Sequence, residues 1–167
     1  MKLVLSLFML LTVARHASSQ TKEDVAAVLD KISTLDDSKR ILDNFRKQIT
    51  GYDKKSLPVL AGFFQDTSMT SVYSHCLSRK LTKGELAIIV ADLTETMPYA
   101  QVTQVQNCTL TFCDKNPNLI EYYLDYIAKD VAGFTKRYTA WINSKEGRKH
   151  NPIIKTENIN TARLKQQ

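Results

Sequence analysis

Hydrophobic residues recur every three or four positions along most of this chain, and such spacing predicts helices that bury one face. The first stripe comprises Val25, Val28, Leu29, Ile32 and Leu35. Three further stripes follow, at Ile41, Leu42, Phe45 and Ile49, at Leu57, Leu60, Phe63 and Phe64, and at Met69, Val72, Tyr73, Cys76, Leu77 and Leu81. Polar breaks at 36–38 and 66–68 separate the stripes and supply candidate helix caps. The first half of the chain therefore predicts several short amphipathic helices.

The clearest helix start lies at Thr82 and Glu85. A threonine at the N-cap and a glutamate three residues later have the spacing of a capping box, in which two backbone N–H groups are satisfied reciprocally. The stripe that follows comprises Leu86, Ile89, Val90, Leu93 and Met97. Pro98 ends the predicted helix, because the residue before a proline is disfavoured in helical conformation.

The segment 99–113 fits two patterns. One set of its residues has helical spacing, namely Val102, Val105, Thr109 and Phe112. The stretch 109–112 also alternates like a strand and is rich in residues that favour strands. No second strand is evident to pair with it, and an unpaired strand leaves its backbone groups without partners. We therefore expect a helix followed by an irregular loop, with a strand as the alternative.

The most regular pattern belongs to the segment 117–143. Asn116 and Pro117 are typical of a helix start, with a capping residue before a proline in the first turn. Apolar residues then follow in alternating steps of four and three, at Ile120, Leu124, Ile127, Val131, Phe134, Tyr138 and Trp141. A helix over 117–143 has a length of about 40 Å. The whole pattern predicts an all-α fold, a compact bundle of five to six helices with one long C-terminal helix as its spine.

A second stripe runs along the same predicted helix at intervals of seven residues. It comprises Leu119, Tyr126, Gly133 and Ala140. One interpretation is a central helix buried on two sides. A close backbone approach would then explain Gly133, since glycine inside a helix costs about 1 kcal/mol relative to alanine. The alternative is a groove or cavity for an apolar ligand, or a docking surface for a partner protein.

Residues 1–19 have the pattern of a secretory signal peptide. Lys2 precedes a short apolar stretch, and Ala17 and Ser19 place small residues before a cleavage site at Gln20. A span across a bilayer needs about 20 residues, and neither this stretch nor any later one is both long and apolar enough. We therefore expect a secreted, extracellular protein with no transmembrane segment in the mature chain. Segment 20–143 is expected to form a single helical domain.

The composition is that of an ordinary globular protein, with 43% hydrophobic and 24% charged residues among 167. The formal net charge of +6 is unevenly spread. Lys2 and Arg15 lie in the predicted signal peptide, and six basic residues stand against two acidic ones in the segment 144–167. The segment 20–143 is thus formally neutral and has no field to attract nucleic acid, so we expect no nucleic-acid partner. Beyond 143 the apolar pattern stops, which predicts a basic, mobile tail over 144–167.

Cys76, Cys108 and Cys113 are disulfide candidates in an oxidising compartment. We expect Cys76 to bridge to Cys108 or Cys113, because only such a bridge ties the earlier helices to the end of the chain. Either bridge closes a loop of more than about 30 residues and stabilises the fold by about 3–4 kcal/mol. The third thiol is then either buried and inert, or linked to a second chain in a disulfide-linked dimer.

Candidate chemistry is otherwise sparse. Asn107 opens an Asn-Cys-Thr sequon and is the one N-glycosylation candidate. His75 and His150 are the only histidines after the predicted signal peptide, and no spacing of ligand residues matches a zinc site. No glycine-rich phosphate loop and no strand–turn–helix serine motif occurs. We expect no metal, no cofactor and no catalytic residue, and hence a protein that is not an enzyme.

Two functions suit such a chain. The first is that of a secreted, non-enzymatic helical protein that acts by protein–protein interaction, through a helical face or the basic tail. The alternative is an extracellular carrier of a small hydrophobic or lipid ligand held between helices. An enclosed apolar cavity on the order of several hundred Å³ favours the carrier. A solid core with exposed apolar side chains favours the interaction protein.

Overall fold

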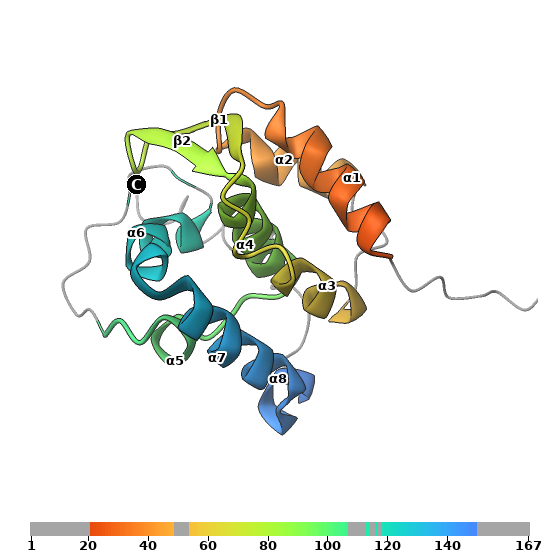
Figure 1. Ribbon diagram of the computed structural model, residues 1–167, viewed down its shortest axis with the longest axis vertical. Coiled ribbons are helices and arrows are strands. Elements are labelled where there is room, and N and C mark those ends of the chain that lie inside the picture. Colours follow the sequence, from red (N-terminus) through yellow and green to blue (C-terminus); the bar gives the residue numbers. More distant parts are fainter. Residues whose placement is uncertain (1–20, 49–53, 107–112, 114–115, 117, 150–167) are drawn as a thin grey trace, which may run out of the picture.

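A computed structural model gives the fold of part of this chain (Figure 1). The residues that it describes are 21–48, 54–106, 113, 116 and 118–149. The predicted signal peptide, the sequon at Asn107, the cysteine Cys108 and the tail beyond 149 all lie outside them.

The described part is mostly helical and contains one small two-stranded sheet. Short 3₁₀ helices, labelled η, join several of the α-helices. In chain order the elements are α1 (Lys22–Ser33), α2 (Arg40–Gln48), η1 (Lys54–Ser56), α3 (Leu57–Ala61), β1 (Met69–Ser74), β2 (Arg79–Thr82), α4 (Lys83–Thr94), α5 (Tyr99–Thr103), η2 (Leu119–Tyr123), α6 (Leu124–Ile127), η3 (Ala128–Asp130), α7 (Val131–Asn143) and α8 (Lys145–Lys149).

Helix α4 is the central element of the fold. Its predicted capping box is confirmed, because the Thr82 hydroxyl accepts from the Glu85 N–H and the Glu85 carboxylate accepts from the Thr82 N–H. Every residue from Gly84 to Asp92 is buried, so the helix is covered on all sides rather than on one. Helices α1 and α3 and the segment η2 contact it. Figure 1 shows α1 and α3 toward one side of α4, with α6 and α7 toward the other.

The prediction of an all-α fold is wrong, because residues 69–82 form an antiparallel hairpin instead of a helix. In β1 the buried residues are Thr70, Val72 and Ser74, which alternate with more exposed ones. This period of two, together with the β-branched residues Thr70 and Val72, favours a strand. The stripe from Met69 to Leu81 fitted helical spacing by coincidence, since its members divide between the two strands and their turn.

Contacts from a distant loop complete the hairpin. The backbone of Tyr73 exchanges hydrogen bonds with Asp36 and Ser38, over 3.1 and 3.0 Å, so the loop after α1 pairs with part of β1. The Thr70 hydroxyl donates to the Leu81 carbonyl oxygen across the hairpin over 2.7 Å. The loop thus supplies partners for the backbone of Tyr73 on the side of β1 away from β2.

Ser78 in the hairpin turn has φ of 54°, in the left-handed region that favours glycine. We expect Ser78→Gly to raise the free energy of unfolding by about 0.5–1 kcal/mol, because the side chain no longer strains the backbone. Ser71→Gly on the exposed side of β1 is the matched control, and we expect it to lower the free energy of unfolding by a similar amount. Urea titration measures both variants, and equal destabilisation by the two would contradict the assigned turn geometry.

The predicted long helix over 117–143 is interrupted, which is a second correction. Helical conformation extends from Leu119 to Asn143, but it passes through η2, α6 and η3 before α7 begins. Asp130 has φ of −152° and ψ of 62°, and its carboxylate accepts from the Gly133 N–H over 2.9 Å. Asp130 is therefore an N-cap in the middle of the predicted helix. The short and interrupted helices do not form the expected bundle of five to six.

An aromatic cluster joins α7 to the loop after α3. The ring of Phe64 lies 5.6 Å from that of Phe134 and 5.0 Å from that of Tyr138. Trp141 continues the cluster, 5.5 Å from Tyr138. Phe134, Tyr138 and Trp141 are buried, as the alternating steps of four and three predicted. The hydrophobic core thus runs from α1 through α4 to this face of α7.

The first residues of the predicted tail are helical. Residues 145–149 form α8, which contacts α7. Gly147 is buried, and the Lys54 ammonium donates to its carbonyl oxygen over 3.1 Å.

Candidate functional site

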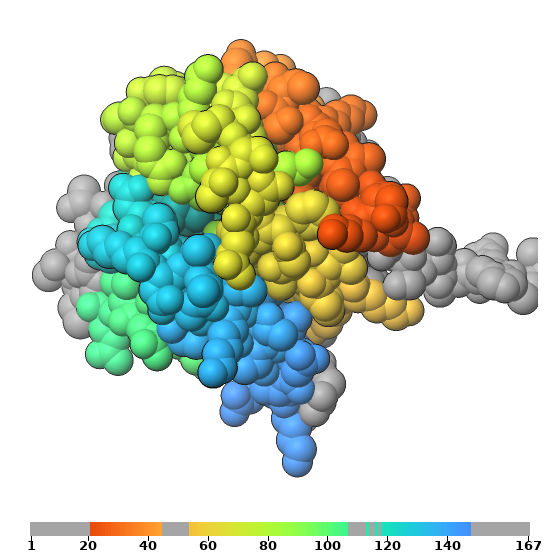
Figure 2. All heavy atoms as spheres, viewed as in Figure 1, coloured from red at the N-terminus to blue at the C-terminus, as the bar shows by residue number. Residues whose placement is uncertain are grey.

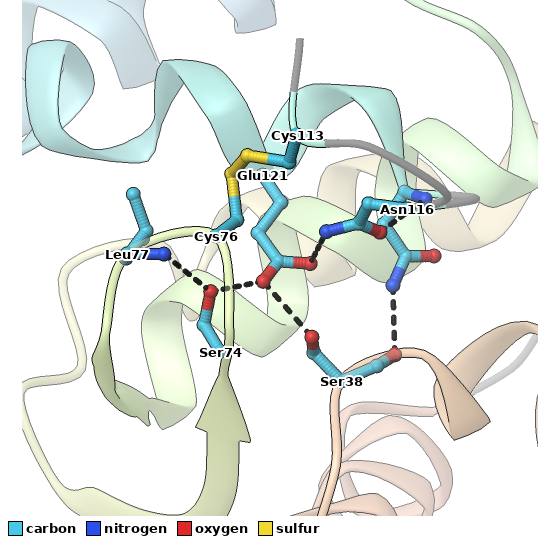
Figure 3. The surroundings of a disulfide bond; sticks show 8 residues. Ser38, Ser74, Cys76, Leu77, Cys113, Asn116 and Glu121 are labelled. Atoms are coloured by element: carbon cyan, nitrogen blue, oxygen red, sulfur yellow. Dashed lines mark hydrogen bonds between the residues drawn. A yellow bond between two sulfur atoms is a disulfide. The ribbon is translucent and has the colours of Figure 1, made fainter.

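The disulfide joins Cys76 to Cys113, one of the two partners that the sequence leaves open for Cys76 (Figure 3). Cys76 lies in the hairpin turn, and the two Cα atoms are 5.3 Å apart. The bridge spans 37 residues in the sequence. Closing a loop of this length stabilises a fold by about 4 kcal/mol in the chain-entropy model. The hairpin is thereby fixed to the segment that leads into η2.

Beside the disulfide lies Glu121, a fully buried carboxylate that no basic side chain pairs with among the described residues. Its Oε1 accepts hydrogen bonds from the hydroxyls of Ser38, over 2.9 Å, and Ser74. Its Oε2 accepts from the side-chain amide of Asn116 over 2.8 Å. Figure 3 shows the carboxylate at the centre of these donors. A buried carboxylate needs such donors because burial removes its hydration.

The donors to Glu121 come from three parts of the chain that are distant in sequence. Ser38 follows α1, Ser74 ends β1, and Asn116 precedes η2. Asn118 adds a further link, because its side-chain amide donates to the Ser38 carbonyl oxygen over 2.8 Å. Asn116 does not cap an α-helix as predicted. Its Oδ1 accepts from the Asn118 N–H, outside any α-helix. The network therefore holds η2 in place against the hairpin and the loop after α1.

The segment η2–α6, fixed in this way, carries a group of exposed apolar side chains. Leu119 and Tyr126 are 39% and 41% exposed, and Tyr122 between them is partly exposed. The rings of Tyr122 and Tyr126 are 6.2 Å apart, and the Lys129 ammonium lies 5.0 Å from the Tyr126 ring centroid. We call Leu119, Tyr122 and Tyr126 the aromatic face. Sequence periodicity placed Leu119 and Tyr126 on one stripe, but their exposure is contrary to the interpretation of a helix buried on two sides. Tyr122 was not part of that stripe.

The other two residues of the predicted stripe lie on α7, beyond the interruption at Asp130. Ala140 is exposed. A Cβ at Gly133 would collide with the carboxylate of Asp130, which folds back to cap α7. The atoms close to Gly133 therefore belong to a capping side chain, and not to the backbone of another element as the first interpretation required. The four stripe residues do not form one continuous surface.

A pocket of about 160 Å³ lies on the other side of α6. Its apolar lining comprises Phe64, Ile88, Leu124, Ile127, Ala128 and Val131. Its polar lining comprises Gln65, Asp66, Thr67, Thr82 and Glu85. The segment from α3 into β1 and the α6–α7 region, which supply most of this lining, adjoin on the face shown in Figure 2.

A second buried carboxylate, Asp92, lies near the end of α4. It accepts hydrogen bonds from the Met97 N–H over 3.0 Å and from the Tyr99 hydroxyl over 2.8 Å. Burial raises the pKa of Asp92 to about 6, although both hydrogen bonds favour the ionised form. Burial, with the nearby Asp92 charge, also raises the pKa of Tyr99. Asp92 thus fastens the connection between α4 and α5.

The elevated pKa of Asp92 predicts a pH dependence of stability. Its usual pKa is 3.8, so between about pH 4 and 6 the folded protein holds a proton on Asp92 that the unfolded chain has lost. The free energy of unfolding therefore falls as pH rises through this window, by about 2–3 kcal/mol. Urea titration between pH 4 and 7 measures the change. We expect Asp92→Asn to abolish it.

The exposed residue Asp125 supplies the control, because Asp125→Asn is expected to retain the pH dependence. Three carboxylates, those of Asp36, Asp66 and Asp130, have pKa values held below the usual range by hydrogen bonds. Their contributions are lost only as pH falls below about 4, outside the window. An unchanged pH dependence in Asp92→Asn would contradict the assignment.

Glu95 and Tyr138 lie close to Asp92 in the same buried region. The Glu95 carboxylate is 2% exposed, and its Oε1 lies 2.8 Å from the Lys54 Nζ. The Tyr138 hydroxyl has no hydrogen-bond partner within the described part of the chain. Burial raises the pKa of Tyr138, and the charges of Asp92 and Glu95 add to the effect. These groups do not line the pocket of about 160 Å³.

Comparisons with protein-family models, with curated proteins and with solved structures found no match to this chain. Within the described ranges, no three side chains of His, Cys, Asp or Glu are grouped so that they could hold a metal ion. Nor is any helix in those ranges long and apolar enough to cross a membrane. The distinctive features of the described part are therefore the disulfide, the aromatic face, the pocket and the buried acids.

Proposed function

We propose that this protein acts by binding another protein through the aromatic face. The observation that carries the proposal is the exposure of Leu119 and Tyr126, at 39% and 41%, on a segment whose interior side is buried. Met69 is also exposed, but it stands alone on β1. Leu119, Tyr122 and Tyr126 instead occupy one stretch of η2–α6, with the Lys129 ammonium against Tyr126. Aromatic residues are enriched in the central part of protein interfaces.

The support behind the aromatic face favours the same interpretation. Glu121 anchors η2 from beneath through its three donors, and the Cys76–Cys113 disulfide closes the segment before it. The ring of Tyr122 contacts that of Tyr123 edge-on at 5.4 Å, and Tyr123 stacks on Tyr99 at 5.2 Å. A surface held so firmly loses little conformational entropy when a partner binds.

The size of the pocket favours the interaction protein over the lipid carrier. Sites for ligands of ordinary size enclose about 300–1,000 Å³. The pocket beside α6 has about 160 Å³ and lies between the α3–β1 connection and α6, which leaves too little room for a lipid chain. The core of the described part is otherwise made of closely contacting apolar residues.

The proposal is of a secreted protein that is not an enzyme. The signal-like pattern of residues 1–19 and the Cys76–Cys113 disulfide both support an oxidising, extracellular location. Asp92, the carboxyl whose pKa is raised to about 6, bonds to Met97 and Tyr99 and does not line the pocket, which supports a structural role. Intact-mass measurement of the secreted protein tests the location, because the mature chain is expected to begin at Gln20.

Site-specific photo-crosslinking tests the aromatic face. A photoreactive residue replaces Tyr126 in one sample and the exposed Ala132 of α7 in the control, and each is mixed with extracellular fluid from the source organism. We expect a discrete crosslinked protein from position 126 only. Excess unlabelled wild-type protein should suppress the product, whereas Leu119→Asp protein should not. Equal crosslinking from both positions, or suppression by Leu119→Asp, would contradict the proposal.

A further inference from the structure

The pocket beside α6 has the size of a binding site for a very small molecule. Its volume of about 160 Å³ is too small for a lipid. An apolar cavity of about 150 Å³ in a protein core is nevertheless large enough to bind benzene. We propose that this pocket binds a neutral molecule of about six to ten non-hydrogen atoms that contains one aromatic ring.

The lining of the pocket matches an aromatic ring. Phe64 from the loop after α3, Ile88 from α4, and Leu124 and Ile127 from α6 supply apolar surface from three separate parts of the fold. These four side chains are buried in the core, whereas Gln65, Thr67 and Ala128 are exposed, so the pocket has a fixed apolar floor and is open to solvent. Contact with such walls stabilises a bound apolar ring, because it removes the ring from water.

The charges around the pocket favour a neutral ligand over an ionic one. Thr82 and Val131 line it at the first turns of α4 and α7, where helix N-termini carry partial positive charge. Asp66 and Glu85 also line it, and hydrogen bonds from Ser68 hold the pKa of Asp66 below its usual range. Glu85 is paired with the Arg79 guanidinium over 2.6 Å. A cation thus meets the positive helix ends, whereas an anion meets the Asp66 carboxylate. A ring with a hydroxyl group avoids both repulsions and can hydrogen-bond to the polar lining.

This site is independent of the proposed partner surface. Leu124 and Ile127 are buried and face the pocket, whereas Tyr126 between them is exposed on the aromatic face. A failure of one proposal therefore leaves the other standing.

Phenol is a suitable probe, and NMR of the methyl groups of Ile88, Leu124, Ile127 and Val131 reports its position. We expect saturable shifts of these methyl signals with a dissociation constant of about 1 mM or below, which a ligand of this size can achieve. Benzoate and benzylammonium should bind at least about tenfold more weakly. Absence of saturable binding, shifts confined to other residues, or equal binding of a charged analogue would overturn the proposal.

Two variants that fill the pocket from opposite walls complete the test. Ala128 and Thr67 are exposed residues that line it, so Ala128→Phe and Thr67→Phe should leave the core intact. Either substitution should weaken phenol binding at least about tenfold, whereas Ala132→Phe, outside the pocket, should leave it unchanged. Melting curves establish that each variant is folded. Wild-type affinity in both folded filling variants would overturn the assignment.

Discussion

Replacing Phe134 with alanine is expected to lower the free energy of unfolding by about 3–5 kcal/mol. Phe134 is fully buried, and its ring contacts those of Phe64 at 5.6 Å and Tyr138 at 6.1 Å. Removing the ring loses its burial and leaves a cavity between α7 and the loop after α3. Domains of this size have a total stability of about 5–15 kcal/mol, so a large fraction disappears. Denaturant titration measures the loss.

The matched control is Lys136→Ala, two residues further along the same helix. Lys136 is exposed, so its truncation should change the free energy of unfolding by less than about 0.5 kcal/mol. If Lys136→Ala proves as damaging as Phe134→Ala, the assigned buried face of α7 is wrong.

Replacing Glu121 with alanine is expected to lower the free energy of unfolding by about 2–4 kcal/mol. The substitution removes the shared acceptor of Ser38, Ser74 and Asn116. The Ser38 and Ser74 hydroxyls then stay buried without this acceptor. Stranding a buried donor costs about 1–3 kcal/mol, and relief of the buried charge offsets part of the total. The same denaturant titration measures the effect.

Two further substitutions separate the hydrogen bonds of Glu121 from its bulk. Glu121→Gln keeps one acceptor oxygen for Ser38 and Ser74 but turns an N–H group toward the Asn116 amide, so we expect an intermediate loss of about 1–2 kcal/mol. Asp125→Ala removes an exposed carboxylate nearby and should cost less than about 1 kcal/mol. Equal stability of all three variants would show that Glu121 does not organise this region.

The elements that sequence alone could predict are those with a complete local signal. Helix α1 buries Val25, Leu29 and Ile32, as their spacing required. Helix α4 begins at the predicted capping box, whose two hydrogen bonds form within four residues of the chain. On α7, the steps of four and three located its buried face correctly. In each case the information lies in neighbouring residues, so no distant partner was needed.

The hairpin was missed although its two strands are close in sequence, because only part of its pairing is local. Tyr73 bonds to the backbone at Asp36 and Ser38, which stand more than about thirty positions earlier, and no local pattern reveals such pairing. Apolar spacing from 69 to 81 satisfied a helical period equally well. The alternation of Thr70, Val72 and Ser74 was the contrary signal, but two of these residues are polar and did not enter the hydrophobic stripe.

The interruption of the last helix did have a local signal. Asp130 stands three residues before Gly133, the spacing at which an N-cap carboxylate accepts from a backbone N–H. Hydrophobic periodicity does not reveal this cap, because Ile127, Val131 and Phe134 keep the same spacing on either side of Asp130. A capping residue inside a periodic stretch can therefore begin a new helix, as a capping residue at its end does.

The candidate site was only half visible in the sequence. Spacing placed Leu119 and Tyr126 on one stripe but did not decide whether they are buried or exposed. Cys76 was expected to bridge to Cys108 or Cys113. Burial of Glu121 could not be foreseen, because a polar residue on a helix is ordinarily exposed and its donors come from distant segments.

The most direct test of the proposed function is native mass spectrometry of the protein purified from its own source. A secreted binding protein predicts a chain that begins at Gln20, contains the Cys76–Cys113 disulfide and forms a complex with a second protein. Substitution of Leu119 and Tyr126 by aspartate should abolish that complex in recombinant protein mixed with the same partner. A chain that instead carries a lipid and forms no protein complex, or a complex that survives both substitutions, would contradict the proposal.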